Sequence, residues 1–287
     1  MATMSTVWDR TTEFLGDNLA SLTPIALFGI FLPLALIGNL MPLMGAVGLA
    51  GSSVVGIVVV ILSLASNWGA VAVTALALDP AAGRASAVRT ANRRFLPILG
   101  VNVIALVGLF LVFLPAMVGF AMSGIPTDQM TGDMTGAQPS LETINAPIVL
   151  FASLYTLALL PVLLWIVARL SVIIPILVDE RRGLGAFAQA FRLTRGSALK
   201  IMGVMLLYLI VSQVAGLAAR MVAGAVFGIV LGGLGPMSLS GILTASVVAI
   251  VSTIFLVLAV AFLAKLYLAL RDARARSAHL DAPVVGA

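Results

Sequence analysis

The sequence predicts an all-α fold: a polytopic transmembrane helical bundle of about six crossings, with short amphipathic interfacial helices and a parallel internal repeat. The first observation is compositional. Of the 287 residues, 61% are hydrophobic and only 9% are charged, and the mean hydropathy is +1.18. Soluble domains carry about a quarter charged residues, so this chain has more apolar surface than a water-soluble core can hide. Long uncharged spans and the basic clusters between them are the other two observations.

Residues 18–78 form one uncharged span that is long enough for two crossings, because a membrane helix needs about 20 apolar residues. We expect these helices near Pro24–Leu43 and Ser53–Leu76, with a turn between them marked by Pro42 and the glycines at 45, 48 and 51. The N-terminal 22 residues precede the first crossing and form a separate amphipathic segment.

Four more crossings follow. The third lies within Phe95–Thr127, where Pro97 suits the first turn because its missing N–H needs no partner there. A polar loop, Ser123–Asn145, separates it from the fourth, in which Pro161, Arg169 and Pro175 are potential interruptions. The last three crossings are expected at about Pro147–Leu177, from Leu199 onward, and at Ile242–Ala264.

The short apolar stretch Met221–Leu231 leaves two interpretations open. Eleven residues are too few to cross a bilayer, so the stretch either extends a long, tilted fifth helix or forms an outer-leaflet helix after it. Within it, Gly224, Gly228 and Gly232 recur every four residues. Small residues at this spacing let helices approach closely in lipid, which predicts a packing face, possible contact with another protein or a second copy of this chain, or, as the weaker alternative, a permeation role.

The basic residues predict the orientation. Of the 16 basic residues, 13 fall into three clusters, which six crossings place on one side, whereas the loops on the other side have no Lys or Arg. The positive-inside rule then puts both termini in the cytoplasm, with a membrane domain at 23–270 and a cytoplasmic tail at 271–287. The clusters are Arg84, Arg89, Arg93 and Arg94; Arg181, Arg182, Arg192, Arg195 and Lys200; and Lys265, Arg271, Arg274 and Arg276.

An internal repeat is indicated by two short segments, Asp79–Gly83 and Asp179–Gly183, which align at an offset of 100 residues. Each ends a predicted membrane helix and precedes an arginine-containing connector. One face of the first connector carries Val88, Ala91 and Phe95, and one face of the second carries Leu184, Phe187 and Phe191. Such helices lie in the membrane interface with their arginines among anionic headgroups. The alternative is that the arginines only set topology. The candidate headgroup contacts are Arg89, Arg93, Arg94, Arg181, Arg182, Arg192 and Arg195.

The N-terminal segment is amphipathic in a different way. An acidic stripe, formed by Asp9, Glu13 and Asp17, disfavours an anionic headgroup layer. We hypothesise that this helix packs over the basic connectors. Its apolar face is expected to comprise Met4, Trp8, Leu15, Leu19 and Leu22.

Polar side chains at membrane depth form a candidate intramembrane site. An intramembrane charge is a functional hypothesis by default, and parallel repeats occur in some transporters, so a solute path is one interpretation. The other is structural: Arg169 snorkels or pairs with Asp79 or Asp179, Arg220 sits near the outer interface, and the amides bond between helices. The candidates are Asn67, Arg169, Gln213 and Arg220.

The sequence offers little catalytic chemistry. It has no cysteine and a single histidine, His279, near the C-terminus. The H-E-x-x-H, G-x-S-x-G and Walker lysine motifs are missing from the sequence. The basic residues adjoin apolar runs and do not share one soluble face, which disfavours nucleic-acid binding. We therefore expect a non-enzyme without cofactors whose partners are membrane lipids.

Residues 174–180 (IPILVDE), with Gly183, Ala186, the run Ala190–Thr194 and Arg195–Gly196, carry a family resemblance. They are similar to the membrane domain attached to some bacterial glycerophosphodiester phosphodiesterases, and to related stand-alone inner-membrane proteins of unknown function. The chain departs from that pattern at Phe191, where a small polar residue is common. The resemblance extends to the six-helix layout, but only this stretch is motif-like.

The resemblance implies a location in the bacterial inner membrane. The histidines and acids of the soluble phosphodiesterase site are not found here, so the resemblance does not imply that activity. It implies an accessory or scaffolding membrane module that positions a partner or contacts anionic lipid. The alternative is a small permease for a solute or lipid.

Overall fold

The structure is a computed structural model that describes residues 4–45, 47–124, 145–180, 185–233 and 237–280. The described residues are almost entirely helical, and six of their segments are long and apolar enough to cross a membrane. The predicted fold class, an all-α polytopic bundle, is confirmed. The six segments are Leu19–Gly45, Ala50–Leu78, Pro80–Ala121, Ala146–Asp179, Ala198–Leu231 and Leu239–Arg276.

The chain divides into two compact units, of which the first comprises Met1–Ile98 and Arg169–Ala287 and the second Leu99–Ala168. In the second unit, the outer parts of two long helices pack together. The hydroxyl of Tyr155 donates to the carbonyl oxygen of Val112 at 2.8 Å. A Cβ on Gly119 would lie 3.0 Å from that of Ala152, so the two backbones are close there.

The first crossing is a helix with an irregular middle. It runs through α2 (Leu19–Ala26), a π-helical turn η1 (Leu27–Phe31), α3 (Leu32–Leu40) and a 3₁₀ turn η2 (Met41–Gly45). Pro33 has no N–H to give to the carbonyl four residues earlier, and the helix widens just before it, where the Leu32 N–H reaches Leu27. The crossing begins at Leu19, earlier than the predicted Pro24.

The second crossing, α4 (Leu49–Leu78), approaches the first very closely. A Cβ on Gly69 would lie only 2.5 Å from the carbonyl oxygen of Gly29. Beside this crossing point, the indole Nε1 of Trp68 donates to Oδ1 of Asn92 at 2.8 Å. Glycine at both positions is thus what allows these two helices to touch through their backbones.

The first connector differs from its prediction. A short 3₁₀ turn, η3 (Pro80–Ala82), leads into α5 (Gly83–Ala121), which contains the connector and the third crossing in one helix. Pro97 accordingly lies inside α5 and not in its first turn. The cause is local, because residues 84–96 contain helix-favouring alanines and arginines and neither glycine nor proline to break the helix.

The second connector is separate, as predicted. The fourth crossing, α7 (Ala146–Leu170), passes Pro161 without a break and turns at residues 171–172 into α8 (Ile173–Asp179). The short helix α9 (Gly185–Leu193) follows, and Gly196, with a φ of +88°, turns the chain into the fifth crossing. This left-handed glycine is why the second connector does not continue straight into its crossing.

Helix α10 (Ala198–Leu231) contains the whole stretch Met221–Leu231, which settles that stretch as an extension of the fifth helix. Gly232, with a φ of +72°, follows as the helix cap. Gly224 faces α11 (Leu239–Leu280), where Thr244 Cγ2 lies 3.9 Å from the position of its missing Cβ. Contact with another copy through these glycines stays a prediction.

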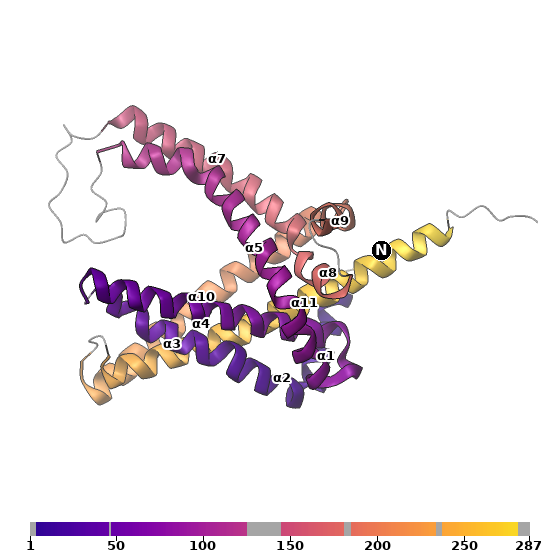
Figure 1. Ribbon diagram of the computed structural model, residues 1–287, viewed down its shortest axis with the longest axis horizontal. Helices are drawn as coiled ribbons and strands as arrows, with labels where there is room; N and C mark the ends of the chain where they lie inside the picture. The colour runs from indigo at the N-terminus through magenta and orange to yellow at the C-terminus, as the bar shows by residue number, and fades with distance from the viewer. Residues whose placement is uncertain (1–3, 46, 125–144, 181–184, 234–236, 281–287) are drawn as a thin grey trace, which may run out of the picture. The chain divides into compact units, whose positions relative to one another are not determined.

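Helix α11 is the central element of the first unit. It packs against α3, α4, α10 and the N-terminal helix α1 (Met4–Asp17), and these helices lie alongside one another in Figure 1. Alanines at the contacts let the backbones approach closely. It continues as one helix past residue 270, where the sequence predicts a boundary. The buried residues of α11 include Ala261, Ala264, Leu266 and Tyr267, and those of α4 include Val71, Ala72, Val73, Leu76 and Ala77.

The hypothesis for α1 is wrong about its partner. This helix packs mainly against α11, and its buried residues are Val7, Thr11 and Phe14. Trp8 and Leu19, which we predicted on the apolar face, are largely exposed. Burying Val7 and Phe14 against an apolar helix is more favourable than covering arginine-bearing connectors.

Candidate functional site

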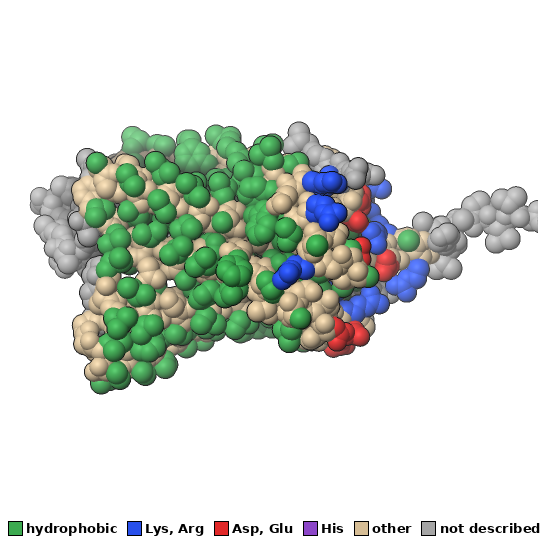
Figure 2. All heavy atoms as spheres, turned by 60° about the horizontal axis from the view of Figure 1, so that its bottom comes forward, with side chains coloured by type: hydrophobic (Ala, Val, Ile, Leu, Met, Phe, Trp, Pro, Cys, Tyr) green, Lys and Arg blue, Asp and Glu red, His purple; other side chains and the backbone are tan. Residues whose placement is uncertain are grey.

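The charges gather near the C-terminal ends of α4, α8 and α11. This region is called here the basic end, and it comprises Asp79, Asp179, Lys265 and Arg271 together with the exposed arginines of α5 and α9. In Figure 2, blue and red side chains gather at one end beside a broad hydrophobic surface. Every described charged side chain belongs to the first unit, since the acids of 99–168 fall outside the described residues. The contacts of the basic end described below therefore all lie within the first unit.

A tyrosine at the centre of this region joins α11 to the end of α8. The buried hydroxyl of Tyr267 lies 2.8 Å from Oδ2 of Asp179 and 2.9 Å from Oε1 of Glu180, within donating distance of both. Arg271 donates to the same Asp179 oxygen at 2.6 Å. Gln189 of α9 donates to Glu180 Oε1. The adjacent carboxylates are thus used to hold three helices together.

The ion pair between Arg271 and Asp179 contributes only modestly to the stability of this network. The side chains of Arg271 and Asp179 are 47% and 34% exposed. Exposed pairs contribute about 0.2–1 kcal/mol. The buried tyrosine contributes more, because a carboxylate without a donor in that position would lose a charge-assisted bond.

A lysine connects three helices on the neighbouring face. Lys265 Nζ donates to the carbonyl oxygen of Ala77 at 2.8 Å and lies 4.6 Å from the centroid of the Phe14 ring. The last carbonyls of a helix have no intrahelical partner, and Lys265 satisfies one of them at the end of α4. The acids predicted to form a stripe on α1 are divided here, because Glu13 and Asp17 share a cavity with Lys265 whereas Asp9 does not.

The second connector is held at its C-terminal end by arginines. Arg169 donates to the carbonyl oxygen of Phe191 at 3.0 Å, and its guanidinium carbon lies 5.8 Å from the centroid of that ring. Arg274 of α11 donates to the carbonyl oxygen of Arg192. Arg169, predicted as an intramembrane group, thus acts as a cap for α9.

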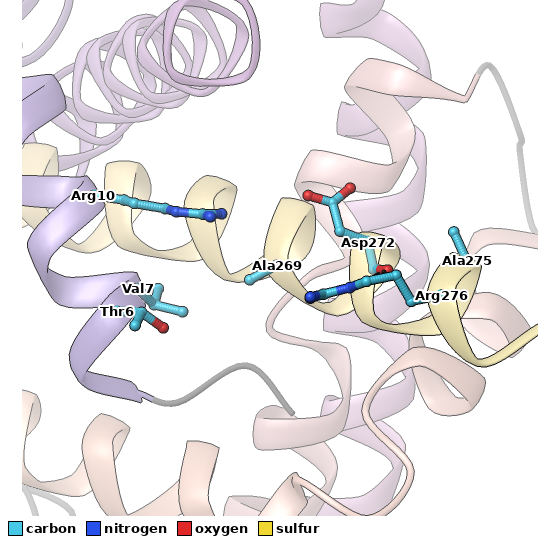
Figure 3. A pocket seen from close by; sticks show the side chains of 7 residues that line it. All are labelled: Thr6, Val7, Arg10, Ala269, Asp272, Ala275 and Arg276. Carbon is cyan, nitrogen blue, oxygen red and sulfur yellow. Dashed lines mark hydrogen bonds between the residues drawn. The ribbon is translucent and has the colours of Figure 1, made fainter. Parts of the chain in front are cut away.

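Two open cavities flank α1 at the basic end. One, of ≈ 600 Å³, lies between α1 and α11, and Figure 3 shows Arg10 reaching from α1 toward α11 while Arg276 folds back along α11 toward Ala269. The other, of ≈ 490 Å³, shares Arg10 and Asp272 with it and adds Lys265, among other residues. Charges of both signs line these cavities, so neither strongly selects one sign of ligand.

The two aspartates of the predicted repeat meet at this end. Asp79 and Asp179 both line a smaller cavity of ≈ 140 Å³ between α4, α5 and α8. Oδ1 of Asp79 also accepts from the N–H of Ala82 at 3.3 Å and so caps η3. Equivalent residues of the predicted repeat therefore converge, and each has a role at a helix end.

The predicted headgroup arginines occupy different settings. Those that the structure describes lie on α5 and at α9, and most are exposed. Arg94 is the half-buried member. Exposed guanidinium groups on helices at the border of apolar spans are free to meet anionic groups. Arg89, Arg93, Arg192 and Arg195 are exposed, and Arg181 and Arg182 lie outside the described residues.

A second polar site lies in the apolar part of the first unit, where α10 faces α11. Gln213 and Arg220, two of the predicted intramembrane residues, line the same groove of ≈ 350 Å³. Asn67 on α4 is half-buried elsewhere, so the four candidates do not form one site. Sequence reasoning missed Tyr208, Ser212 and Ser252, which also line the groove. The spacing of Tyr208 and Ser212 from Gln213 and Arg220 along α10 was an available signal, whereas Ser252 comes from α11 and had none.

No protein-family profile, curated protein or solved structure matches this chain. Six apolar helices of sufficient length make it an integral, multi-pass membrane protein.

Proposed function

We propose that this protein is a non-enzymatic accessory module of the bacterial inner membrane, with cytoplasmic termini, whose basic end contacts anionic lipids. The observation that carries the proposal is the set of exposed arginines on α5 and around α9, beside the apolar spans. Each basic residue near an anionic leaflet adds about 1 kcal/mol of attraction.

The placement of the carboxylates supports this proposal. Asp179 and Glu180 are directed toward Tyr267 and Arg271 of the same chain. Arg89 and Arg93 have no such described partner, because no described carboxylate forms an ion pair with either. The carboxylates of Asp179 and Glu180 thus bond within the chain, while Arg89 and Arg93 lie on the surface without an ion pair to a described carboxylate.

The accessory role rests on the limited chemistry of the basic end and on the resemblance of residues 174–196 to a phosphodiesterase membrane domain. The described polar groups there connect helices: Tyr267 joins α11 to α8, and Lys265 joins α11 to α4. A rigid membrane module with a charged surface is suited to positioning a soluble partner at the membrane. Hydrolysis of glycerophosphodiesters by the purified chain would contradict the non-enzymatic part.

The lipid contact is tested by electron paramagnetic resonance of spin-labelled lipids around the reconstituted protein. We expect spin-labelled phosphatidylglycerol to associate more strongly than phosphatidylcholine. The double variant Arg89→Gln/Arg93→Gln should reduce this preference by up to about 25-fold, since about 1 kcal/mol for each of the two charges corresponds to a factor of about five per charge.

The matched control removes two charges from the cavity between α1 and α11, as Arg10→Gln/Arg276→Gln. Arg276 follows Lys265 by 11 residues and so stands about 16 Å farther along α11. This variant should keep the lipid preference. An equal loss in both variants would show a dependence on net charge alone, and no loss in either would remove the proposal.

A small solute or lipid permease is the second candidate, favoured by the polar groove between α10 and α11. It predicts uptake of a solute, or flipping of a labelled lipid, in liposomes that contain the protein. Arg220→Gln should abolish that flux, whereas Arg276→Gln should not. Flux that is the same in protein-free liposomes would exclude this candidate.

A further inference from the structure

The groove between α10 and α11 has the chemistry of an anion site within an apolar region. We infer that it binds a phosphate group, with the guanidinium of Arg220 as the principal contact and Gln213 and Ser252 as further donors. The phosphate is carried by a membrane phospholipid or dissolved in water; the recognition chemistry is the same. This inference goes beyond the arginine surface proposed above and does not depend on it.

The facing contacts of the two helices place Arg220 far from either end of the apolar span. On one side, Tyr208 donates to the carbonyl oxygen of Phe255 at 2.9 Å. On the other, Gly224 faces Thr244. Arg220 lies between these contacts and shares the groove with Val248.

The depth of Arg220 in the apolar span can be estimated from the rise per residue of α11, because Val248 of α11 lines the same groove. Val248 precedes Lys265 by 17 residues and follows Leu239 by nine, which corresponds to about 25 Å and about 13 Å along α11. Residues 239–264 carry no charge. A cation is thus held inside a span that otherwise carries no charge, and such residues mark ligand paths or need a partner.

No described residue is that partner. Arg220 is exposed, and it forms neither a hydrogen bond nor an ion pair with any residue in the described part of the chain. No acid lines the groove. The local charge is therefore positive, and an anion is the ligand that lowers the cost of holding a guanidinium at this depth.

The surrounding side chains fit a phosphate. Gln213 and Ser252 also form no hydrogen bond with described residues, so their donors are available on two sides of the groove. Tyr208 and Ser212 are already bonded to backbone carbonyls and form one wall. Gly216 leaves the middle open, because a Cβ there would have no neighbour within 4 Å. The planar guanidinium binds phosphate oxygens in pairs.

One arm of the test concerns lipid. Protein purified in dodecyl maltoside and stripped of lipid is titrated with phosphatidylglycerol or phosphatidylcholine, and bound lipids are counted by native mass spectrometry. If the phosphate belongs to a lipid, wild type retains one more phospholipid than Arg220→Gln, with about tenfold weaker binding in the variant. Arg276→Gln and Arg89→Gln/Arg93→Gln should retain that lipid, which separates this site from the arginine surface.

The other arm concerns dissolved phosphate. The lipid-free protein is heated in the same detergent with rising inorganic phosphate, with chloride at equal ionic strength as reference. If the phosphate is a free ion, phosphate raises the Tm of wild type but not of Arg220→Gln, and the lipid counts of the two are equal.

Two glycine variants separate groove filling from general damage. Gly216→Leu fills the groove and should abolish whichever binding is seen, whereas Gly203→Leu, at another position of α10 with open space around it, should leave binding intact. Arg220→Lys should bind with intermediate strength because it keeps the charge and loses the paired geometry. Equal lipid retention and equal phosphate response in wild type and Arg220→Gln would overturn the inference.

Discussion

Lys265 Nζ donates to the carbonyl oxygen of Ala77 at 2.8 Å, across 188 residues of sequence, and the Phe14 ring covers the same ammonium group at 4.6 Å. This relationship joins α11, α4 and α1 at one point. It places a cation at the C-terminal end of α4, where the helix dipole favours positive charge.

Replacing Lys265 with methionine is expected to destabilise the protein by about 1–3 kcal/mol, because the Ala77 carbonyl loses its donor in a half-buried position. Reversible unfolding in mixed micelles with rising sodium dodecyl sulfate measures the difference. Lys200→Met is the control, since Lys200 is exposed and its loss should change stability by less than about 0.5 kcal/mol. Equal effects of the two substitutions would contradict the role given to Lys265.

Tyr267→Phe should cost more than Tyr208→Phe in the same unfolding experiment. Each substitution removes one hydroxyl, but Tyr267 donates to carboxylates and Tyr208 to a backbone carbonyl. Bonds to charged groups are worth about 1.5–3 kcal/mol and neutral ones about 0.5–1.5 kcal/mol. If the two losses are the same, the carboxylate network contributes no more than an ordinary interhelical bond.

Gly69→Ala should destabilise the protein by about 1–3 kcal/mol, because the added methyl group would press on the Gly29 backbone. In α10, Gly203 has open space around it, so Gly203→Ala should be neutral or stabilising by up to about 1 kcal/mol through helix propensity. Unfolding in mixed micelles measures the change in stability for each variant, and the two changes should have opposite signs. A stabilising Gly69→Ala would show that the two helices do not touch at this point.

Glu13→Lys is expected to loosen α1, whereas Asp9→Lys is not. Glu13 lines a cavity with Arg10, Lys265 and Arg271, so a lysine there would add a fourth cation. Asp9 is exposed and does not line that cavity. Amide hydrogen exchange across residues 4–17 measures the difference, and faster exchange in both variants would instead indicate sensitivity to net charge.

Six crossings would place the two termini on one side of the membrane, and the positive-inside rule predicts that this side is the cytoplasm. A green fluorescent protein fused to the C-terminus should therefore fluoresce, and alkaline phosphatase inserted at Asp133 should be active in the periplasm. A C-terminal fusion that does not fluoresce, or a phosphatase insertion at Asp133 that is inactive, would contradict the six-crossing arrangement.

The sequence by itself determined the class of the protein and the number of its membrane segments. Apolar spans and basic clusters follow directly from the cost of burying charge in lipid, so they are readable without knowing what each helix contacts. The second connector was predicted as a separate helix and is one, and the structure adds that Gly196, with a φ of +88°, turns the chain after it. The sequence named Gln213 and Arg220 as candidate intramembrane residues, but the structure is what places them in one groove.

Only the tertiary structure decided which face of each helix is buried and which helix it packs against. Composition alone does not show that α1 buries Val7 and Phe14 against α11, because several faces of that helix are apolar enough to pack. Arg169 was expected at membrane depth or paired with an aspartate, and the structure adds its bond to the Phe191 carbonyl, a backbone group that no sequence pattern marks. Tyr267, Lys265 and Ser252 acquired their roles from residues far away in the chain. Helix periodicity specifies a face, but the partner on that face is set by the packing of the whole unit.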